Sequence, residues 1–366
     1  MTGLPVKNRM RPLRMRPWRT LPLHVFIVVF LATTAITATR AHAEIRMLFF
    51  GDVMVGRRIE TIIQEYGIPH FFTDVTVLPD GRSIHDFHLV SANLEGAVTD
   101  GGRHFPPVYP YDFAFPPERI AALTEAGITY FSIANNHLYD QGEIGVESTR
   151  RLLSELEIAY SGDVDSVVGD YSVTTVEVAG FTVALVGLSE VYRPLDRNAV
   201  IALLEEVEPT VDLMVVNIHW GVEYEHLPRK HQRDMAIILS RAGADMIIGH
   251  HPHVTQGIEF VGNVPVFYSL GNFIFDQAFS EEVRQGYAVA VVWDVQKGFV
   301  TGSIDLHPYR ADSYVPYWLA DDERNRRLSQ LAEWSFGTPE LKGQIRAGRI
   351  VLKTPFNARV HALLAE

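Results

Sequence analysis

Histidine, asparagine and carboxylate side chains recur in the sequence directly after short apolar runs. These residues are Asp52, Asn93, Glu95, Asn135, Asn136, His137, His219, His250, His251 and His253. Imidazole, carboxylate and amide groups together are the ligand set that proteins use for zinc, manganese or iron. A single histidine in such a place is more often a hydrogen-bonded structural residue. Five apolar runs that are each followed by such residues instead favour a metal centre.

The absence of cysteine narrows this chemistry. With no cysteine among 366 residues, disulfides, zinc-thiolate sites and cysteine nucleophiles are all excluded. Any metal must therefore be held through nitrogen and oxygen atoms, and the histidine, asparagine and carboxylate side chains after the apolar runs provide these atoms.

The apolar runs before these residues have the length and composition of buried β-strands. They cover residues 45–50, 88–92, 128–134, 211–218 and 245–248. The active sites of open α/β sheets gather at the carboxyl ends of their strands. We therefore expect the polar residues to lie close together at one edge of an α/β fold.

Helical segments alternate with these strands. We expect helices from Pro117 to about Gly127, and over 145–156, 231–242 and 320–334. Asp140 is a candidate cap for the second of them. Strand-rich sequence follows the histidine cluster, and the simplest organisation is one large α/β domain with a small C-terminal appendage.

The charge of the chain is unevenly distributed. The formal net charge is -12, but residues 1–43 hold seven of the 32 Lys and Arg residues and no acidic residue. The remainder has 25 basic against 44 acidic residues, a formal charge of -19. Since nucleic-acid binding needs a basic surface, we do not expect a nucleic-acid partner.

The basic N-terminal stretch is typical of a targeting segment. An apolar run at 21–36 follows it, and then Ala41-His42-Ala43, the small-x-small pattern of a signal-peptidase site. We expect a signal peptide at 1–43 and an exported mature protein beginning near Glu44. An uncleaved N-terminal anchor is the alternative, and it too places the rest of the chain outside the cytoplasm.

Six motifs, in order, resemble those of the CapA family of capsule-synthesis or poly-γ-glutamate-biosynthesis proteins. They are Gly51-Asp52-Val53-Met54, Asn93-Leu94-Glu95, the stretch from Ala134 to Gly142, His219-Trp220-Gly221, Gly249-His250-His251-Pro252-His253 and Tyr268-Ser269-Leu270-Gly271-Asn272-Phe273. The resemblance implies an α/β metallophosphoesterase-like fold, a four-layer α-β-β-α sandwich with two mixed sheets. It places this domain at 44–366, with its motif core at 46–276 and an appendage at 281–366.

The resemblance also implies roles for the strand-end residues. A bridging Glu95 would join one metal held by Asp52 and His253 to another held by Asn136, His219 and His251. His137 would serve as the acid beside the leaving group, with Asp140 either orienting it or only capping the helix. Met54 stands where the metallophosphoesterase pattern has a histidine, so one or two ions of Mn, Zn or Fe are expected.

Further residues near the motifs are candidates for substrate contact. They are Asn93, Asn135, Arg57, Glu223, Tyr224, His250 and Asn272. A surface arginine is usually solvated, and asparagines often form turns, so each also has an ordinary structural interpretation.

The function implied is an exported metal-dependent hydrolase or transferase that acts on a phosphoester or γ-glutamyl amide. The substrate would be a cell-surface polymer or a small molecule, and a membrane synthetase complex is the candidate partner. Because Met54 removes one ligand, the alternative is a non-catalytic subunit that binds polymer or organises a synthetase. A nucleotidase acting on small nucleotides is a weaker third hypothesis.

Overall fold

The computed structural model describes residues 42–100, 112–296 and 299–352. The chain divides into two units, Met1–Ala41 and His42–Glu366, and the described residues all belong to the second. The expected signal peptide or anchor therefore falls, except for its last two residues, outside the described part. Within that part, no helix has both the length and the apolar character that a membrane crossing requires.

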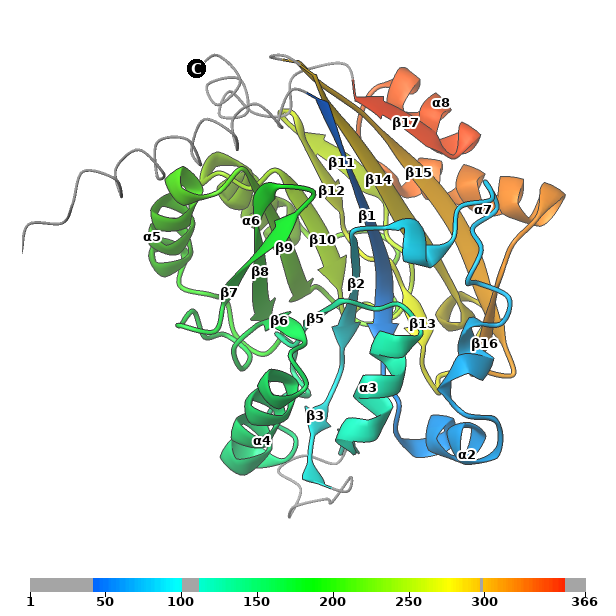
Figure 1. Cartoon of the computed structure of the whole chain (residues 1–366). Helices are drawn as coiled ribbons and strands as arrows, with labels where there is room; N and C mark the ends of the chain where they lie inside the picture. The colour runs from blue at the N-terminus through cyan, green and yellow to red at the C-terminus, as the bar shows by residue number, and fades with distance from the viewer. Residues whose placement is uncertain (1–41, 101–111, 297–298, 353–366) are drawn as a thin grey trace, which may run out of the picture. The chain divides into compact units, whose positions relative to one another are not determined.

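One mixed sheet contains nine strands within the described residues, in the order β16-β15-β14-β1-β2-β5-β6, with β13 beside β1 and β17 beside β15. Their bounds are β1 (His42–Val53), β2 (Leu89–Leu94), β5 (Tyr130–Ser132), β6 (Ala159–Ser161), β13 (Asn272–Ile274), β14 (Gln285–Gln296), β15 (Phe299–Asp312), β16 (Val315–Trp318) and β17 (Arg349–Leu352). Strands β1, β2, β5 and β6 run parallel, whereas β14 is antiparallel to β1. Figure 1 shows β1 in blue near the middle of this sheet.

The second mixed sheet has six strands among the described residues, in the order β11-β12-β10-β9-β8-β7. Their bounds are β7 (Val173–Val178), β8 (Phe181–Glu190), β9 (Leu213–Trp220), β10 (Met246–His250), β11 (Ile258–Val261) and β12 (Val264–Phe267). Strands β8, β9, β10 and β12 are parallel, and the outer strands β7 and β11 are antiparallel to their neighbours. A separate pair joins β3 (Ala97–Val98) and β4 (Ala114–Phe115).

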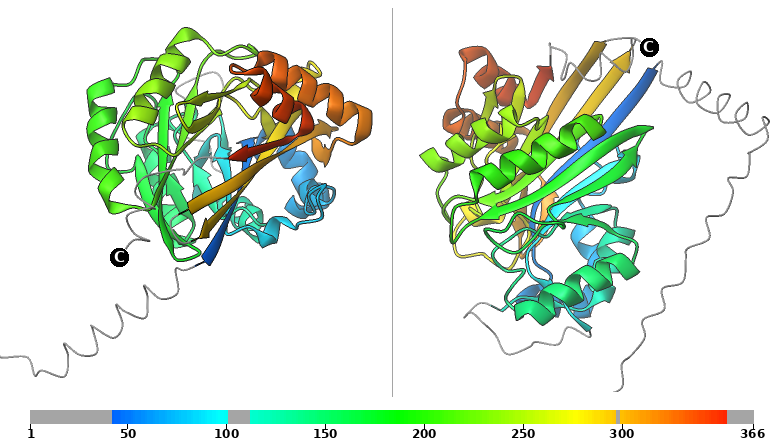
Figure 2. Two further views of the ribbon diagram at one scale, coloured as in Figure 1. Left: turned by 90° about the horizontal axis from the view of Figure 1, so that it is seen from above. Right: turned by 90° about the vertical axis from the view of Figure 1, so that its left-hand side faces the viewer.

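The two sheets pack face to face through an apolar core. Phe49 and Val289 of the first sheet share this core with Leu185 and Val215 of the second. Helices α2 (Arg57–Tyr66), α3 (Pro117–Glu125) and α4 (Gly142–Glu155) cover the outer face of the first sheet, and α5 (Arg197–Val207) and α6 (Lys230–Arg241) cover that of the second. The right-hand view of Figure 2 shows α5 and α6 in front of the second sheet. The expected α-β-β-α sandwich with two mixed sheets is confirmed.

The C-terminal segment is more closely integrated than the sequence suggested. Residues expected to form an appendage supply β14 and β15, and β14 pairs with β1 from His42 to Phe49. Helices α7 (Asp321–Trp334) and α8 (Pro339–Ala347) place Leu328, Leu331 and Ile345 in the core between the sheets. The described part of 281–366 is therefore a structural part of the sandwich.

Short 3₁₀ helices fill several connections. They are η1 (Ile68–Phe72), η2 (Ile84–Asp86), η4 (Glu208–Thr210) and η5 (Glu282–Arg284). The expected helices correspond to α3, α4, α6 and α7, with boundaries within a few residues of those given by the sequence. Helices α2, α5 and α8 were not anticipated.

A buried carboxyl group ends strand β8. The Glu190 side chain is 7% exposed, and its Oε1 accepts no hydrogen bond from the described residues. Burial raises the pKa of Glu190 to about 7, although an amide hydrogen bond from Leu195 and the charge of Arg197 act in the opposite direction. Near neutral pH the fold therefore carries a carboxyl group that resists ionisation.

We predict that Glu190→Gln makes stability less sensitive to pH. Because the folded-state pKa lies above the value of 4.5 for an unperturbed glutamate, protonated Glu190 stabilises the fold at low pH. That contribution is lost as the pH rises through 7. The stability of the variant relative to wild type should therefore rise by up to about 3 kcal/mol between about pH 5 and pH 8 in urea denaturation. A difference that does not change with pH would contradict this.

Candidate metal centre

The parallel strands bring the predicted polar residues to one edge of the sandwich. In the first sheet, Asp52 at the end of β1 pairs in register with Asn93 of β2. In the second sheet, His219 of β9 pairs with His250 of β10. Asn136 and His137 follow β5, and His251 and His253 follow β10. All ten strand-end residues are buried, with exposed fractions of 8% or less.

Asp52, Glu95 and His253 form one group of candidate ligands. Each offers one ligand atom, and these atoms lie within 4.8 Å of one another. The Nδ1 atom of His253 is 3.4 Å from Oδ2 of Asp52, and its Nε2 is 3.5 Å from Oε1 of Glu95. Those two carboxylate oxygens are buried and accept no hydrogen bond from the described residues. Since buried carboxylate oxygens need a compensating charge, the group fits a cation.

A second group adjoins the first through His253. Glu223, His251 and His253 also present ligand atoms within 4.8 Å of one another. Nearby, Nε2 of His219 is 2.8 Å from Oδ1 of Asn136, and the rings of His219 and His251 are 4.8 Å apart. The predicted ligands of the second metal are thus brought together. Glu223, which the sequence suggested only as a substrate contact, joins them.

The amide of Asn93 connects the carboxylates. Its Nδ2 donates to Oδ1 of Asp52 at 2.8 Å and to Oε2 of Glu95 at 3.3 Å, and it lies 3.4 Å from Nδ1 of His219. Asn135 donates to Oδ1 of Asn93 at 3.2 Å. Both asparagines are fully buried, and their contacts position the candidate ligands Asp52 and Glu95. Their role as substrate contacts stays a prediction.

His250 and Asn272 have comparable positioning contacts. Nδ1 of His250 is 3.2 Å from Oδ1 of Asp52. Oδ1 of Asn272 lies 2.9 Å from Nδ1 of His253, an arrangement that directs Nε2 of His253 toward Glu95. Outer amides of this kind fix the tautomer and the orientation of a ligand imidazole. Both side chains are buried, and their role as substrate contacts stays a prediction.

Burial and mutual charge set the protonation of the centre. Burial opposes ionisation of Asp52, but the adjacent imidazoles of His250 and His253 hold its pKa well below the usual range. Burial raises the pKa of Glu95 well above the usual range. Burial disfavours the charge on His253, yet Glu95 and Asp52 outweigh it and raise the pKa to about 9. Without metal, Glu95 and His253 therefore retain protons, whereas Asp52 is ionised.

The imidazoles of His219 and His251 are held in the neutral form. Burial lowers the pKa of His219 well below the usual range. Burial and the neighbouring His253 lower the pKa of His251 to about 3. Neutral imidazole is the form that binds a metal ion, so both side chains are ready to act as ligands at neutral pH.

His137 and Asp140 form a buried pair beside the carboxylates. Nδ1 of His137 lies 2.7 Å from Oδ2 of Asp140, and its Nε2 lies 3.8 Å from Oε1 of Glu95. Asp140 also accepts a hydrogen bond from the backbone N–H of Phe113. Helix α4 begins at Gly142 and has no side-chain cap. The helix-cap interpretation of Asp140 is therefore wrong, and its carboxylate orients His137.

The backbone around the histidines adopts an unfavourable conformation. His251 and His253 have φ values of 94° and 57°, in the region that favours glycine, and Tyr224 has a φ of 66°. The N–H of Tyr224 donates to the carbonyl oxygen of Pro252, which holds the two loops together. Each such residue costs of order 1–3 kcal/mol, and these conformations cluster where function constrains the side chains.

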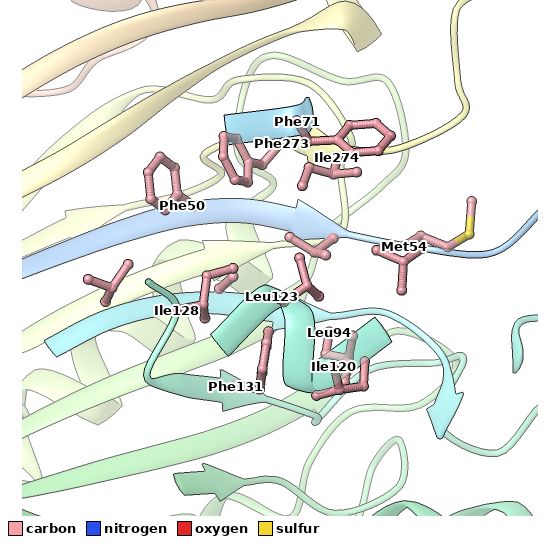
Figure 3. Close-up of a cluster of buried hydrophobic side chains, with 14 of the residues drawn as sticks. Phe50, Met54, Phe71, Leu94, Ile120, Leu123, Ile128, Phe131, Phe273 and Ile274 are labelled. Carbon is pink, nitrogen blue, oxygen red and sulfur yellow. The ribbon is translucent and has the colours of Figure 1, made fainter. Parts of the chain in front are cut away.

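Met54 does not face the metal centre. Its side chain lies in the apolar cluster with Phe71, Leu94 and Ile274, and its sulfur accepts a hydrogen bond from the N–H of Gly56 (Figure 3). The register of β1 is irregular on both sides of Asp52. Side-chain alternation is broken there, so a residue two positions beyond Asp52 need not share its face.

A pocket of about 230 Å³ opens onto the centre. It is lined by Arg57, Phe113, His137, Glu223, Tyr224, His253, Phe275, Asp276, Gln277 and Phe279. Three predicted substrate contacts, Arg57, Glu223 and Tyr224, therefore face this opening. Phe275 and Phe279 in the walls of this pocket were not predicted, because phenylalanines in a sequence usually indicate core packing.

Comparison with known proteins identifies the family. Residues 46–277 match the family model described as bacterial capsule synthesis protein PGA_cap. The chain belongs to this family.

The chain is also similar to bacterial proteins whose names refer to capsule or PGA biosynthesis. The capsule biosynthesis protein CapA of Bacillus anthracis is 30% identical over 70% of this chain and 68% of its own length. The PGA biosynthesis protein CapA of Bacillus subtilis is 29% identical over 79% of this chain and 82% of its own. A solved structure of a hypothetical protein from Thermus thermophilus covers 75% of this chain and all of its own, at 19% identity and a TM-score of 0.46.

We predict that Met54→His adds no metal ligand. The new imidazole would lie in the apolar cluster without a hydrogen-bond partner, which should cost roughly 1–3 kcal/mol of folding stability. Metal stoichiometry, measured by elemental analysis, should equal that of wild type. Met54→Leu is the matched control and should cost less than about 1.5 kcal/mol. A gain of bound metal in the histidine variant would show that position 54 faces the centre.

Proposed function

We propose that this capsule-synthesis family member is a metal-dependent hydrolase or transferase. The observation that supports it most directly is the pair of buried carboxylate oxygens on Asp52 and Glu95 that accept no hydrogen bond from the described residues. Imidazole and amide groups surround them within ligand distance. A purely structural core has no need of this concentration of charge.

The residues fit one or two transition-metal ions. Asp52, Glu95 and His253 would hold the first, and His219, His251, Asn136 and Glu223 are in place for a second. Mixed imidazole, carboxylate and amide ligands suit Mn, Zn or Fe. Bound there, a metal would act as a Lewis acid and activate water as the nucleophile.

The chain's own residues supply the proton transfer. In a hydrolysis, water adds to the carbonyl carbon or the phosphorus, and the bond to the leaving nitrogen or oxygen breaks. His137 would donate a proton from Nε2 to that leaving atom, while Asp140 holds Nδ1 and stabilises the charged ring. The Nε2 atom lies 3.8 Å from Oε1 of Glu95, close to the proposed metal position.

We further propose that the substrate is a γ-glutamyl amide or a phosphoester of a cell-surface polymer. The names of the Bacillus relatives, which refer to capsule and PGA biosynthesis, support this class. A membrane synthetase complex is the corresponding candidate partner.

Export of the protein belongs to the same proposal. The basic segment, the apolar run at 21–36 and the Ala41-His42-Ala43 site support a signal peptide or an anchor. A chain without cysteine is also indifferent to an oxidising compartment.

A non-catalytic polymer-binding or scaffold subunit is the second candidate function. The placement of Met54 in the apolar core favours it, because the centre then lacks the imidazole that metallophosphoesterases are expected to have at that position. The two candidates differ in whether the protein retains metal and whether turnover depends on that metal.

Metal analysis tests the centre directly. We predict that protein purified without chelators contains Mn, Zn or Fe, and that His251→Ala or His219→Ala lowers metal affinity roughly tenfold or more. His231→Ala is the matched control, since this exposed histidine lies on α6, and it should retain wild-type metal. Metal-free wild-type protein that takes up none of these ions would refute the metal centre.

His137 separates chemistry from metal binding. We predict that His137→Gln retains bound metal but slows cleavage of an aryl phosphate or a γ-glutamyl anilide by about 10²–10⁴-fold, because the general acid is lost. Asp140→Asn should retain metal and shift the pH profile of the rate. Wild-type turnover in His137→Gln would exclude its role as the acid and favour the scaffold function.

A further inference from the structure

Arg57 occupies an unusual position at the mouth of the metal-centre pocket. It is the first residue of α2, and its φ of 52° lies in the region that favours glycine. Its Nε is 3.2 Å from Oδ2 of Asp276, and its guanidinium carbon lies 5.5 Å from the centre of the Phe113 ring. The arginine side chain nevertheless remains 46% exposed. It is thus held from two sides while still facing the pocket.

Asp276 forms an ion pair with Arg57 and is itself almost fully buried. Its side chain is only 6% exposed, and its Oδ1 is buried without a hydrogen bond from the described residues. The contact with Asp276 runs through Nε, and a guanidinium carries further N–H donors on its two terminal nitrogens. A buried carboxylate on one edge of the group and an aromatic ring against its face fix the direction of those remaining donors.

Phe113 connects Arg57 to the reacting centre. The ring of His137 lies 4.2 Å from that of Phe113, centre to centre, so the arginine and the proposed acid contact the same aromatic side chain. Phe275, which precedes Asp276, packs against both Phe113 and His253. A group bound by Arg57 would therefore be separated from His137 only by the Phe113 side chain.

The charge of the pocket selects among anions. Arg57 is its only arginine or lysine among the described lining residues, and Asp276 and Glu223 oppose it. At the Arg57 end of the pocket, a phosphate dianion would meet a single guanidinium whose charge Asp276 already offsets. A carboxylate carries one charge, and its two oxygens match the planar fork of a guanidinium. The walls of Phe275, Phe279 and Tyr224 suit a short aliphatic chain.

We propose that Arg57, held by Asp276 and Phe113, binds a free carboxylate on the substrate and so places an amide of the same molecule beside His137. This rests on the proposed function and narrows it to amides whose acyl portion carries a carboxylate, as a γ-glutamyl group does. Arg57 thereby determines specificity, and Asp276 is a positioning residue.

Equilibrium binding tests this without turnover. The probes are γ-glutamyl-glutamate and the analogue in which the α-carboxylate of the γ-glutamyl residue is a carboxamide, measured by calorimetry on the full chain. Wild type should prefer the carboxylate probe by roughly tenfold or more, because the carboxamide analogue lacks the negative charge and one of the two acceptor oxygens that a guanidinium binds. Arg57→Gln should abolish the preference.

Arg58→Gln is the matched control. Arg58 is the next residue of α2, and its Nη1 contacts the hydroxyl of Tyr314 outside this pocket. This variant should keep the wild-type preference. Asp276→Asn should reduce the preference while metal content, measured in parallel, stays at the wild-type level.

Three results would overturn the inference. The preference could persist in Arg57→Gln, or it could vanish only when the metal is removed, which would mean that the carboxylate binds metal. Phenyl phosphate could also bind more tightly than the carboxylate probe in an Arg57-dependent manner. Since none of these measurements needs catalysis, absence of turnover would refute the proposed function and leave this test intact.

Discussion

Two fully buried carboxylates beside one another are the constraint on which this structure depends. Asp52 lies at the end of β1 and Glu95 directly follows the parallel neighbour β2, and the register of the two strands brings these side chains together. Like charges in a low-dielectric interior repel strongly, and each also loses its hydration. Asn93 donates to both, while His250 and His253 approach Asp52. The second sheet is therefore needed electrostatically as well as for packing, because it supplies these imidazoles.

Much of this centre could be predicted from sequence, because the strand-end rule is local. A buried strand is recognisable as an apolar run, and the polar residue that follows it must lie at the end of the sheet. Parallel neighbours then bring distant positions such as Asp52 and His219 together. The layers of the fold could be predicted only through family resemblance, since strand order depends on long-range pairing. For example, β14 lies beside β1, more than 200 positions earlier in the chain, and no local pattern indicates that pairing.

The positions that sequence could not settle are those where local geometry departs from a regular element. The irregular register at Asp52 turns Met54 into the apolar cluster, although simple alternation would put both residues on one face. Glu223 reaches the histidines because Tyr224 adopts a positive φ and its N–H binds Pro252 of the histidine loop. Such effects arise from contacts between segments, so spacing along the chain does not reveal them.

Asp140 shows how the site takes precedence over local helix stability. Asp140 lies one residue before Gln141, the N-cap of α4, and a side chain that caps a helix contributes about 1 kcal/mol. Helix α4 nevertheless begins without a side-chain cap, while Asp140 binds Nδ1 of His137 and the N–H of Phe113. Burial raises the pKa of Asp140, so holding it beside an imidazole also costs desolvation energy. The contacts of Asp140 fix both the imidazole of His137 and the backbone of Phe113, whose ring borders Arg57. One buried side chain therefore positions the proposed acid and part of the pocket mouth.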